Sequence, residues 1–107
     1  GELKHGPIAL IENGVTVISI LTNPNLVEKC ISNIQEVITR GAKTLVITNQ
    51  KLHNVHFDFV VNIPETNSFI SPILSVVPLQ LLSYYIAKNK GLDVDKPRNL
   101  AKSVTVE

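Results

Sequence analysis

Two apolar runs, separated by a segment with helical periodicity, constrain the fold of this chain more than any other feature. Residues 15–21 (VTVISIL) and 44–48 (TLVIT) are rich in β-branched side chains and almost continuously apolar. Such runs are typical of strands that are buried on both faces of a parallel sheet. Residues 25–40 lie between them and place their apolar side chains on one helical face. The pattern predicts a β-α-β unit with a right-handed crossover.

The predicted helix carries capping residues at both ends. Asn25 can cap its start, Glu28 stands where a capping box requires it, and Gly41 follows its end. A third apolar run, residues 57–63, predicts another strand. The link before it, residues 49–56, is short for a parallel crossover, which normally takes a dozen or more residues. The pattern alone therefore allows either a parallel or an antiparallel third strand.

The last long apolar segment predicts a helix from about residue 69 or 70 to residue 88, with Ser68 or Ser71 as its cap. Gly91 lies beyond its end, and Pro78 inside it predicts a kink. Because this helix is apolar almost all round, we expect the sheet to cover one side and another domain or subunit the other. Three strands and two main helices are few for a free-standing domain, so we expect the chain to be part of a larger protein.

The first twelve residues predict a loop followed by a short helical turn. Pro7 interrupts any preceding helix and suits the first turn of a new one. We expect Ile8, Leu10 and Ile11 to turn inward from this segment.

Composition argues against several functional classes. The 107 residues suffice for one domain, and a net charge of +1 suggests neither nucleic acid nor an anionic membrane as a partner. The longest apolar run, residues 70–87, falls short of the roughly 20 residues that a membrane span needs. The single cysteine, Cys30, excludes an internal disulfide framework and fits a reducing cytosol. We expect Cys30 to be a small core residue of the first helix.

Both ends of the chain resemble one enzyme family. The N-terminal residues GELKHGPIALIE and the C-terminal residues VPLQLLSYYIA and DVDKPRNLAKSVTVE are similar to segments of glucosamine-6-phosphate synthase, also called glutamine–fructose-6-phosphate aminotransferase. The resemblance implies the C-terminal part of the second sugar isomerase (SIS) subdomain. That subdomain is expected to be a flavodoxin-like, three-layer α/β fold with a mostly parallel sheet, here truncated at its N-terminal side. The resemblance also favours a parallel third strand. It implies an α/β body over residues 1–91 and an irregular tail over residues 92–107 that covers the active site.

The resemblance implies an enzyme that takes ammonia from glutamine, transfers it to fructose 6-phosphate and isomerises the product to glucosamine 6-phosphate. This chain would take part in ring opening and ketose–aldose isomerisation, and would be inactive alone. The implied partners are the two sugar phosphates, the upstream SIS half and the glutaminase domain of the same enzyme, and a second copy in a homodimer. No cofactor, metal ion, nucleic acid or membrane is implied, and the implied location is the cytoplasm.

Two residues match catalytic positions of this family. His5 matches the histidine that opens the sugar ring, and it would serve the active site of the neighbouring subunit. Lys102 matches the lysine at the carbonyl end of the sugar, where an ammonium would stabilise an oxyanion or an amine would form an imine. Ala101 would add a backbone contact to the same ligand. Arg98 and Asn99 would anchor the tail.

Other parts of that active site match nothing in this sequence. The carboxylate base and the serine- and threonine-rich phosphate loop of the family lie upstream of the matched segment. Cys30 does not match the nucleophile of the glutaminase domain. Asn23, Pro24 and Asn25 follow the first strand, but Pro24 has no amide and the stretch lacks glycine. We therefore interpret these three residues as a helix cap rather than as a phosphate loop.

The residues by themselves leave alternatives open. A histidine in a polar loop and a lysine near a terminus are more often solvated than catalytic. His53 and His56 are spaced as two metal ligands, but no further ligands are evident. The alternatives are a non-catalytic sugar-phosphate-binding SIS module of a regulatory protein and a structural α/β interaction domain. The match through RNLAKSVTVE favours the enzyme.

Overall fold

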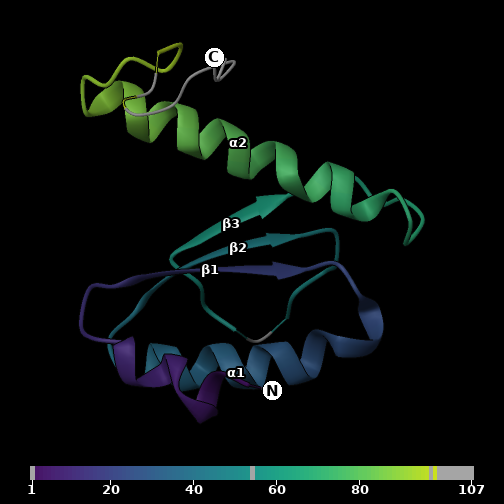
Figure 1. Ribbon diagram of the computed structural model, residues 1–107. Helices are drawn as coiled ribbons and strands as arrows, with labels where there is room; N and C mark the ends of the chain where they lie inside the picture. The colour runs from purple at the N-terminus through teal and green to yellow at the C-terminus, as the bar shows by residue number, and fades with distance from the viewer. Residues whose placement is uncertain (1, 54, 97, 99–107) are drawn as a thin grey trace, which may run out of the picture. The chain divides into compact units, whose positions relative to one another are not determined.

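The fold is taken from a computed structural model, which describes residues 2–53, 55–96 and 98. The elements in chain order are the 3-10 helices η1 (Leu3–His5) and η2 (Pro7–Leu10), strand β1 (Thr16–Leu21), η3 (Pro24–Leu26), helix α1 (Val27–Ile38), strands β2 (Lys43–Thr48) and β3 (Phe59–Asn62), and helix α2 (Ser71–Asn89) (Figure 1). The chain forms two compact units, Gly1–Ser75 and Val76–Glu107.

The three strands form one parallel sheet in the order β1-β2-β3. In this register Ile18 lies beside Leu45, and Leu45 lies beside Phe59. The predicted β-α-β connectivity is confirmed. The third strand is parallel, as the family resemblance implied and the pattern alone left open. All three strands therefore end at the same edge of the sheet.

The connection from β2 to β3 contains no helix. Residues 49–58 can reach about 33 Å when extended, whereas a six-residue strand such as β2 spans about 20 Å. An irregular segment is therefore long enough to return to the start of the sheet. Leu52 and Val55 pack against the core, and Phe57 belongs to it with 7% of its surface exposed. These apolar contacts hold the connection against the core, as the apolar face of a crossover helix would.

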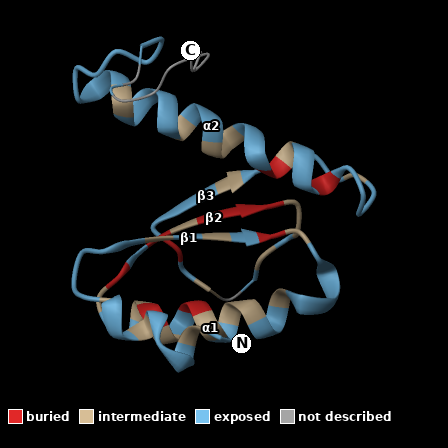
Figure 2. Cartoon of the chain, viewed as in Figure 1, coloured by how far each residue is buried: buried red, intermediate tan, exposed pale blue. Residues whose placement is uncertain are grey.

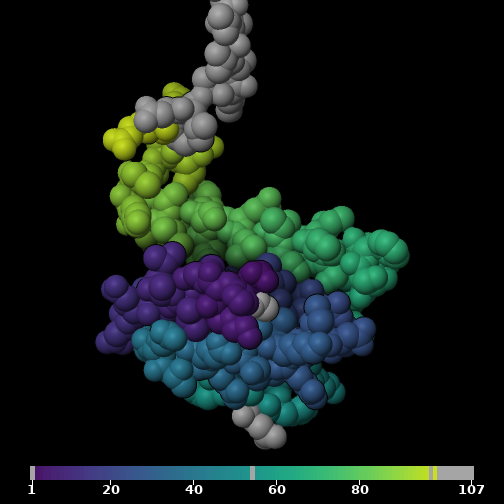
Figure 3. All heavy atoms as spheres, turned by 60° about the horizontal axis from the view of Figure 1, so that its bottom comes forward, coloured from purple at the N-terminus to yellow at the C-terminus, as the bar shows by residue number. Residues whose placement is uncertain are grey.

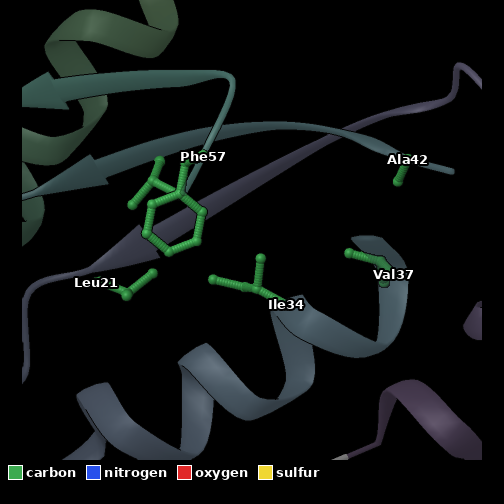
Figure 4. Packing of buried hydrophobic residues seen from close by; sticks show 6 residues of the cluster. Leu21, Ile34, Val37, Ala42 and Phe57 are labelled. Atoms are coloured by element: carbon green, nitrogen blue, oxygen red, sulfur yellow. The ribbon is translucent and has the colours of Figure 1, made fainter. Parts of the chain in front are cut away.

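The core lies between the sheet and α1. Ile34 and Val37 on the buried face of α1 meet Leu21 of β1 and the ring of Phe57 (Figure 4). Cys30 is partly buried against this cluster, as predicted. Full burial of a leucine, isoleucine or valine side chain contributes about 1.5–3 kcal/mol, so a few such residues suffice to fix α1 on the sheet.

Hydrogen bonds between Thr44 and Asp58 join the start of β2 to the residue before β3. Asp58 Oδ2 accepts from the backbone N of Thr44 at 2.7 Å and from Thr44 Oγ1 at 3.0 Å. The backbone N of Asp58 donates to Thr44 Oγ1 at 3.2 Å. We call these three bonds the Thr44–Asp58 clamp. A register shift of one residue would break all three, so the clamp specifies the pairing of β2 with β3. The bonds from the backbone N and then the hydroxyl of Thr44 hold the pKa of the Asp58 carboxyl below its usual value.

Many apolar side chains remain exposed. Ile18 of β1 and Phe59 of β3 are exposed, Phe59 by 61%. Exposed residues are pale blue in Figure 2. In α2, Leu81 is exposed by 52%, and the buried residues are Ser71 and Ser75. The expectation that another domain or subunit covers this helix is not tested by the chain alone and stays a prediction.

The helix caps differ from those predicted. Asn23, not Asn25, supplies the capping oxygen before α1: its Oδ1 accepts from the backbone N of Asn25 at 3.0 Å, at the start of η3. Asn67, rather than Ser68 or Ser71, precedes α2, and its Oδ1 accepts from two backbone amides of the following turn at 3.0 and 3.1 Å. In both places the residue that bonds to the first amides lies earlier in the chain than the predicted cap.

The N-terminal turn is also partly as predicted. Ile8 and Ile11 are partly buried, and Ile11 packs against the core. Leu10 is 76% exposed, which contradicts its predicted inward position. The turn is a 3-10 helix, in which residues three apart align. Ile8 therefore aligns with Ile11 on the inner side, while Leu10 aligns with the exposed Pro7.

The Thr44–Asp58 clamp should make the stability of the protein depend on pH. Because the pKa of Asp58 is lowered in the folded state, its stabilisation is fully present above the unfolded value of about 3.9 and is lost as the pH falls through the folded pKa. Asp58→Asn should lower the urea midpoint at neutral pH, and the difference from the unmodified protein should shrink in acid. Asp95→Asn, at an exposed carboxylate, is the control and should leave the midpoint unchanged. An equal deficit at every pH would contradict the clamp.

Candidate functional site

A hollow of about 440 Å³ lies where the three parallel strands end, entirely within the first unit. We call it the strand-end pocket. Ligands of open α/β sheets usually bind at this edge. Its lining residues are Thr22, Asn23, Pro24 and Asn25 after β1, Asn49 and Gln50 after β2, and Glu65, Thr66, Ser68, Ser71 and Pro72 between β3 and the first turn of α2.

A network of hydrogen bonds orders the floor of this pocket. Thr48 Oγ1, which is buried, donates to the carbonyl oxygen of Leu21 at 2.7 Å and accepts from the backbone N of Gln50 at 2.9 Å. Gln50 Nε2 donates to Asn49 Oδ1 at 2.7 Å. The ends of β1 and β2 are thereby tied together, and the two amide side chains that follow β2 are held side by side.

Asparagine side chains already bond some of the backbone amides at the helix starts beside the pocket. Asn67 Oδ1 accepts from the amides of Phe69 and Ile70, and Asn23 Oδ1 accepts from that of Asn25. Pro24 and Pro72 have no amide to offer. A phosphate cradle requires free amides at a helix start, and the amides of Asn25, Phe69 and Ile70 are already bonded. The interpretation of residues 23–25 as a helix cap is confirmed at Asn23, which caps η3.

The pocket has an acidic and hydroxylic character. Glu65 is the one charged residue that lines it in the part of the chain that the structure describes. Ser71 is 5% exposed, and its Oγ has no hydrogen-bond partner among the described residues. A buried hydroxyl without a partner is uncommon in native proteins and calls for an explanation. Polar side chains that accept or donate to neutral groups therefore dominate this site.

The predicted catalytic residues lie elsewhere or outside the described residues. His5 ends η1 and is exposed, in an N-terminal segment that lies at the surface of the first unit (Figure 3). It does not line the strand-end pocket. Lys102, Ala101 and Asn99 fall outside the described residues. Arg98 is exposed and, with residues of α2, lines a hollow of about 790 Å³ in the second unit.

The two other histidines form no recognisable metal site. His53 and His56 are exposed on the crossover between β2 and β3. Within residues 2–53, 55–96 and 98, three or more histidine, cysteine or carboxylate side chains are nowhere grouped around a possible metal position. In the same residues, no helix combines the length and the hydropathy that crossing a membrane requires.

Residues 1–89 match the family model of the SIS domain. The chain belongs to the SIS domain family. A solved structure, the C-terminal domain of glucosamine-fructose-6-phosphate aminotransferase from Francisella tularensis, superposes with a TM-score of 0.82 and 37% sequence identity, over 90% of this chain and 28% of that one. The α/β fold with a parallel sheet is thus that of this SIS domain.

Curated relatives share the whole length of this SIS chain. The glutamine–fructose-6-phosphate aminotransferases (isomerizing) of Clostridium perfringens and Thermococcus kodakarensis are 61% and 50% identical to it, each over 100% of the chain. The chain spans 18% of the length of each of these relatives. The predicted family is therefore confirmed, and the two ends that carry His5 and Lys102 lie within the matched region.

The strand-end pocket was not foreseen from the sequence. The sequence alone describes the segments of four lining residues only as loops: Asn49, Gln50, Glu65 and Thr66. The signal that could have found them is a rule of topology, because polar residues that directly follow parallel strands meet at one edge. Ser71 carries no such signal, since a serine at the start of a helix is usually a cap.

The floor of the pocket can be tested with Thr48→Val, which keeps the shape of the side chain but removes its hydroxyl. We expect the free energy of unfolding to fall by roughly 1–3 kcal/mol, because the carbonyl of Leu21 and the amide of Gln50 both lose a buried partner. Thr39→Val removes an exposed bond to the carbonyl of Glu36 and should change stability by less than about 0.5 kcal/mol. Denaturant unfolding measures the loss of stability in both variants. An equal loss in Thr48→Val and Thr39→Val would contradict the role given to Thr48.

Proposed function

We propose that this chain is the C-terminal part of the isomerase domain of a glutamine–fructose-6-phosphate aminotransferase. The complete enzyme would convert fructose 6-phosphate and glutamine to glucosamine 6-phosphate and glutamate. The observation that carries the proposal is the 61% identity to a curated aminotransferase over the entire chain. Identity of that extent reaches both termini, where the two proposed catalytic residues lie.

His5 is proposed to open the sugar ring. A histidine can exchange protons near neutral pH, and ring opening moves a proton from the anomeric hydroxyl to the ring oxygen. The exposure of His5 at the end of η1 supports this role, because an imidazole that serves the active site of a neighbouring subunit has to be accessible from outside its own chain. A homodimer is part of the proposal for this reason.

Lys102 is proposed to act at the carbonyl end of the sugar. Its side chain would stabilise the oxyanion that develops during isomerisation, or form an imine with the carbonyl carbon. Ala101 would contribute a backbone contact to the ligand, and Arg98 and Asn99 would hold the tail, residues 92–107, over the active site. The body of the subdomain would be residues 1–91.

The remaining parts of the reaction would come from outside this chain. The proposal places the carboxylate base and the phosphate-binding loop in the upstream half of the isomerase domain, and ammonia release in a glutaminase domain. The chain alone would then be inactive, and the complete enzyme would work in the cytoplasm. The competing hypothesis is a non-catalytic SIS module of a regulatory protein. It predicts that the complete protein forms no glucosamine 6-phosphate, so that replacing His5 or Lys102 has no activity to change.

The role of His5 can be tested by replacing it with alanine in the complete protein. We expect glucosamine 6-phosphate formation to slow by roughly 10²–10⁴-fold, the usual contribution of a general acid–base residue. His53→Ala, at another exposed histidine, is the matched control and should retain full activity. 5-Deoxyfructose 6-phosphate lacks the oxygen that closes the furanose ring, so His5→Ala should impair its conversion far less. An equal loss with both substrates would rule out ring opening.

Lys102→Ala should abolish most turnover, whereas Lys90→Ala, at an exposed lysine just after α2, should not. Treatment with fructose 6-phosphate and borohydride separates the two possible roles. An imine would be reduced to a stable sugar adduct on Lys102, which peptide mass spectrometry would locate. Lost turnover without an adduct would indicate electrostatic stabilisation of the oxyanion. Full activity of Lys102→Ala would contradict both roles.

A further inference from the structure

We propose that Asn13 is a site of spontaneous deamidation, and that the pairing of β1 with β2 controls how fast it reacts. Asn13 and Gly14 lie in the turn that leads into β1, and an asparagine is followed by a glycine nowhere else in the sequence. Asparagine is among the thermally labile residues of proteins. The inference involves neither His5 nor Lys102, so it stands whether or not their proposed catalytic roles hold.

The reaction takes place between the side chain of Asn13 and the next backbone amide, with water as the only co-reactant. The backbone N of Gly14 attacks Cγ of Asn13, the bond from Cγ to Nδ2 breaks, and ammonia leaves with the proton of the attacking amide. Water then opens the resulting cyclic imide. Breaking the bond from the nitrogen to Cγ gives aspartate. Breaking its bond to the main-chain carbonyl carbon gives isoaspartate, whose main chain runs through the former side chain.

The surroundings of Gly14 leave the attacking nitrogen sterically accessible. Glycine has no Cβ to hinder the approach of this nitrogen to the side chain before it. Asn13 and Gly14 are both exposed. Among the described residues, nothing beyond the chain neighbours of Gly14 lies within 4 Å of the position that its Cβ would occupy. Asn67 is also exposed, but a serine follows it, so the same attack is more hindered there.

Two backbone hydrogen bonds hold the attacking amide in place in the folded chain. The backbone N of Gly14 donates to the carbonyl oxygen of Gly41 at 2.8 Å, just before β1 and β2 begin to pair. The backbone N of Val15 donates to the carbonyl oxygen of Glu12 at 3.1 Å and closes the turn. The φ of Gly14 is +85°, as in the third residue of a type II turn. Rotation of the Gly14 nitrogen toward Cγ breaks these bonds, so the reaction requires the turn to open locally.

Close packing between Asn13 and Gly41 adds a second restraint. A Cβ on Gly41 would lie 2.7 Å from Oδ1 of Asn13 and 3.1 Å from its Cα. The φ of Gly41 is +84°, a conformation that other residues rarely adopt. An alanine at position 41 would therefore displace the turn from the start of β2 and weaken the bond that restrains Gly14.

The test incubates the complete protein at neutral pH, folded and in denaturing urea, and follows the peptide that contains Asn13 by mass spectrometry. Deamidation raises the mass of this peptide by the difference between water and ammonia. We expect the folded protein to react roughly ten- to a hundredfold more slowly than the unfolded one, because two hydrogen bonds have to open. In both states Asn13 should react faster than Asn67, which is the internal control.

Two glycine variants should change the rate in opposite directions. Gly41→Ala should speed the reaction of the folded protein by roughly three- to tenfold, because one restraining bond is weakened. Its rate in denaturing urea should not change. Gly14→Ala should slow the reaction in denaturing urea, because its Cβ hinders the attacking nitrogen. If Gly41→Ala does not fold, urea below the unfolding transition opens the turn of the unmodified protein instead, and the rate should rise with its concentration.

Deamidation at this turn should also weaken the sheet. Isoaspartate lengthens the main chain ahead of Gly14, so the bond to Gly41 is lost just before Thr16 pairs with Lys43. Protein aged at neutral pH should therefore unfold at lower urea as its isoaspartate content rises. Aged Asn13→Gln, whose longer side chain cannot close the same ring, should keep its midpoint.

Three results would overturn the proposal. A folded protein in which Asn13 reacts no faster than Asn67 would contradict the site. Equal rates in the folded and unfolded protein, or a folded rate that neither Gly41→Ala nor urea below the unfolding transition changes, would contradict control by strand pairing. An equal loss of stability in the aged unmodified protein and in aged Asn13→Gln would contradict the effect on the sheet.

Discussion

Parallel pairing of the three strands is the constraint on which the rest of this structure depends. It forces the chain to return to the same end of the sheet after each strand, by α1 in one case and by an irregular, apolar crossover in the other. The Thr44–Asp58 clamp fixes the register where β2 begins. Thr48 ties β1 to β2 where both end. Both threonines are buried, and the bond from Thr48 to the carbonyl of Leu21 is itself buried, so leaving it unmade would be costly.

The same constraint places a site at one edge of the sheet. Because every strand ends there, loops that are distant in sequence meet and line one pocket. The bonds that cap the helix starts then influence which ligands the pocket can bind. Asn23 and Asn67 bond three of the amides at the helix starts, and the lining side chains carry amide, hydroxyl and carboxylate groups.

The exposed apolar surface bears on how the chain works. α2 exposes several large side chains, and so do β1 and β3 (Figure 2). Exposed apolar surface of this extent is typical of surfaces that contact another protein or domain. The chain spans 18% of the length of its curated relatives, and the proposed enzyme divides its active site between this chain, the rest of the protein and a second subunit. Under that proposal His5 and Lys102 act on a ligand whose phosphate is bound elsewhere.

The sequence by itself determined the elements and the family. Continuous β-branched runs specified β1 and β2, the apolar stripe specified α1 and the position of Cys30, and the two terminal segments identified the relatives. The predictions that the structure contradicts concern single residues at helix caps and in the N-terminal turn. Asparagines and serines close together compete to cap a helix, and 3-10 geometry turned Leu10 outward. Only the tertiary structure decided the strand-end pocket and left the hydroxyl of Ser71 without a partner among the described residues. Both depend on which loops meet once the strands are paired, and neither loop composition nor periodicity encodes that meeting.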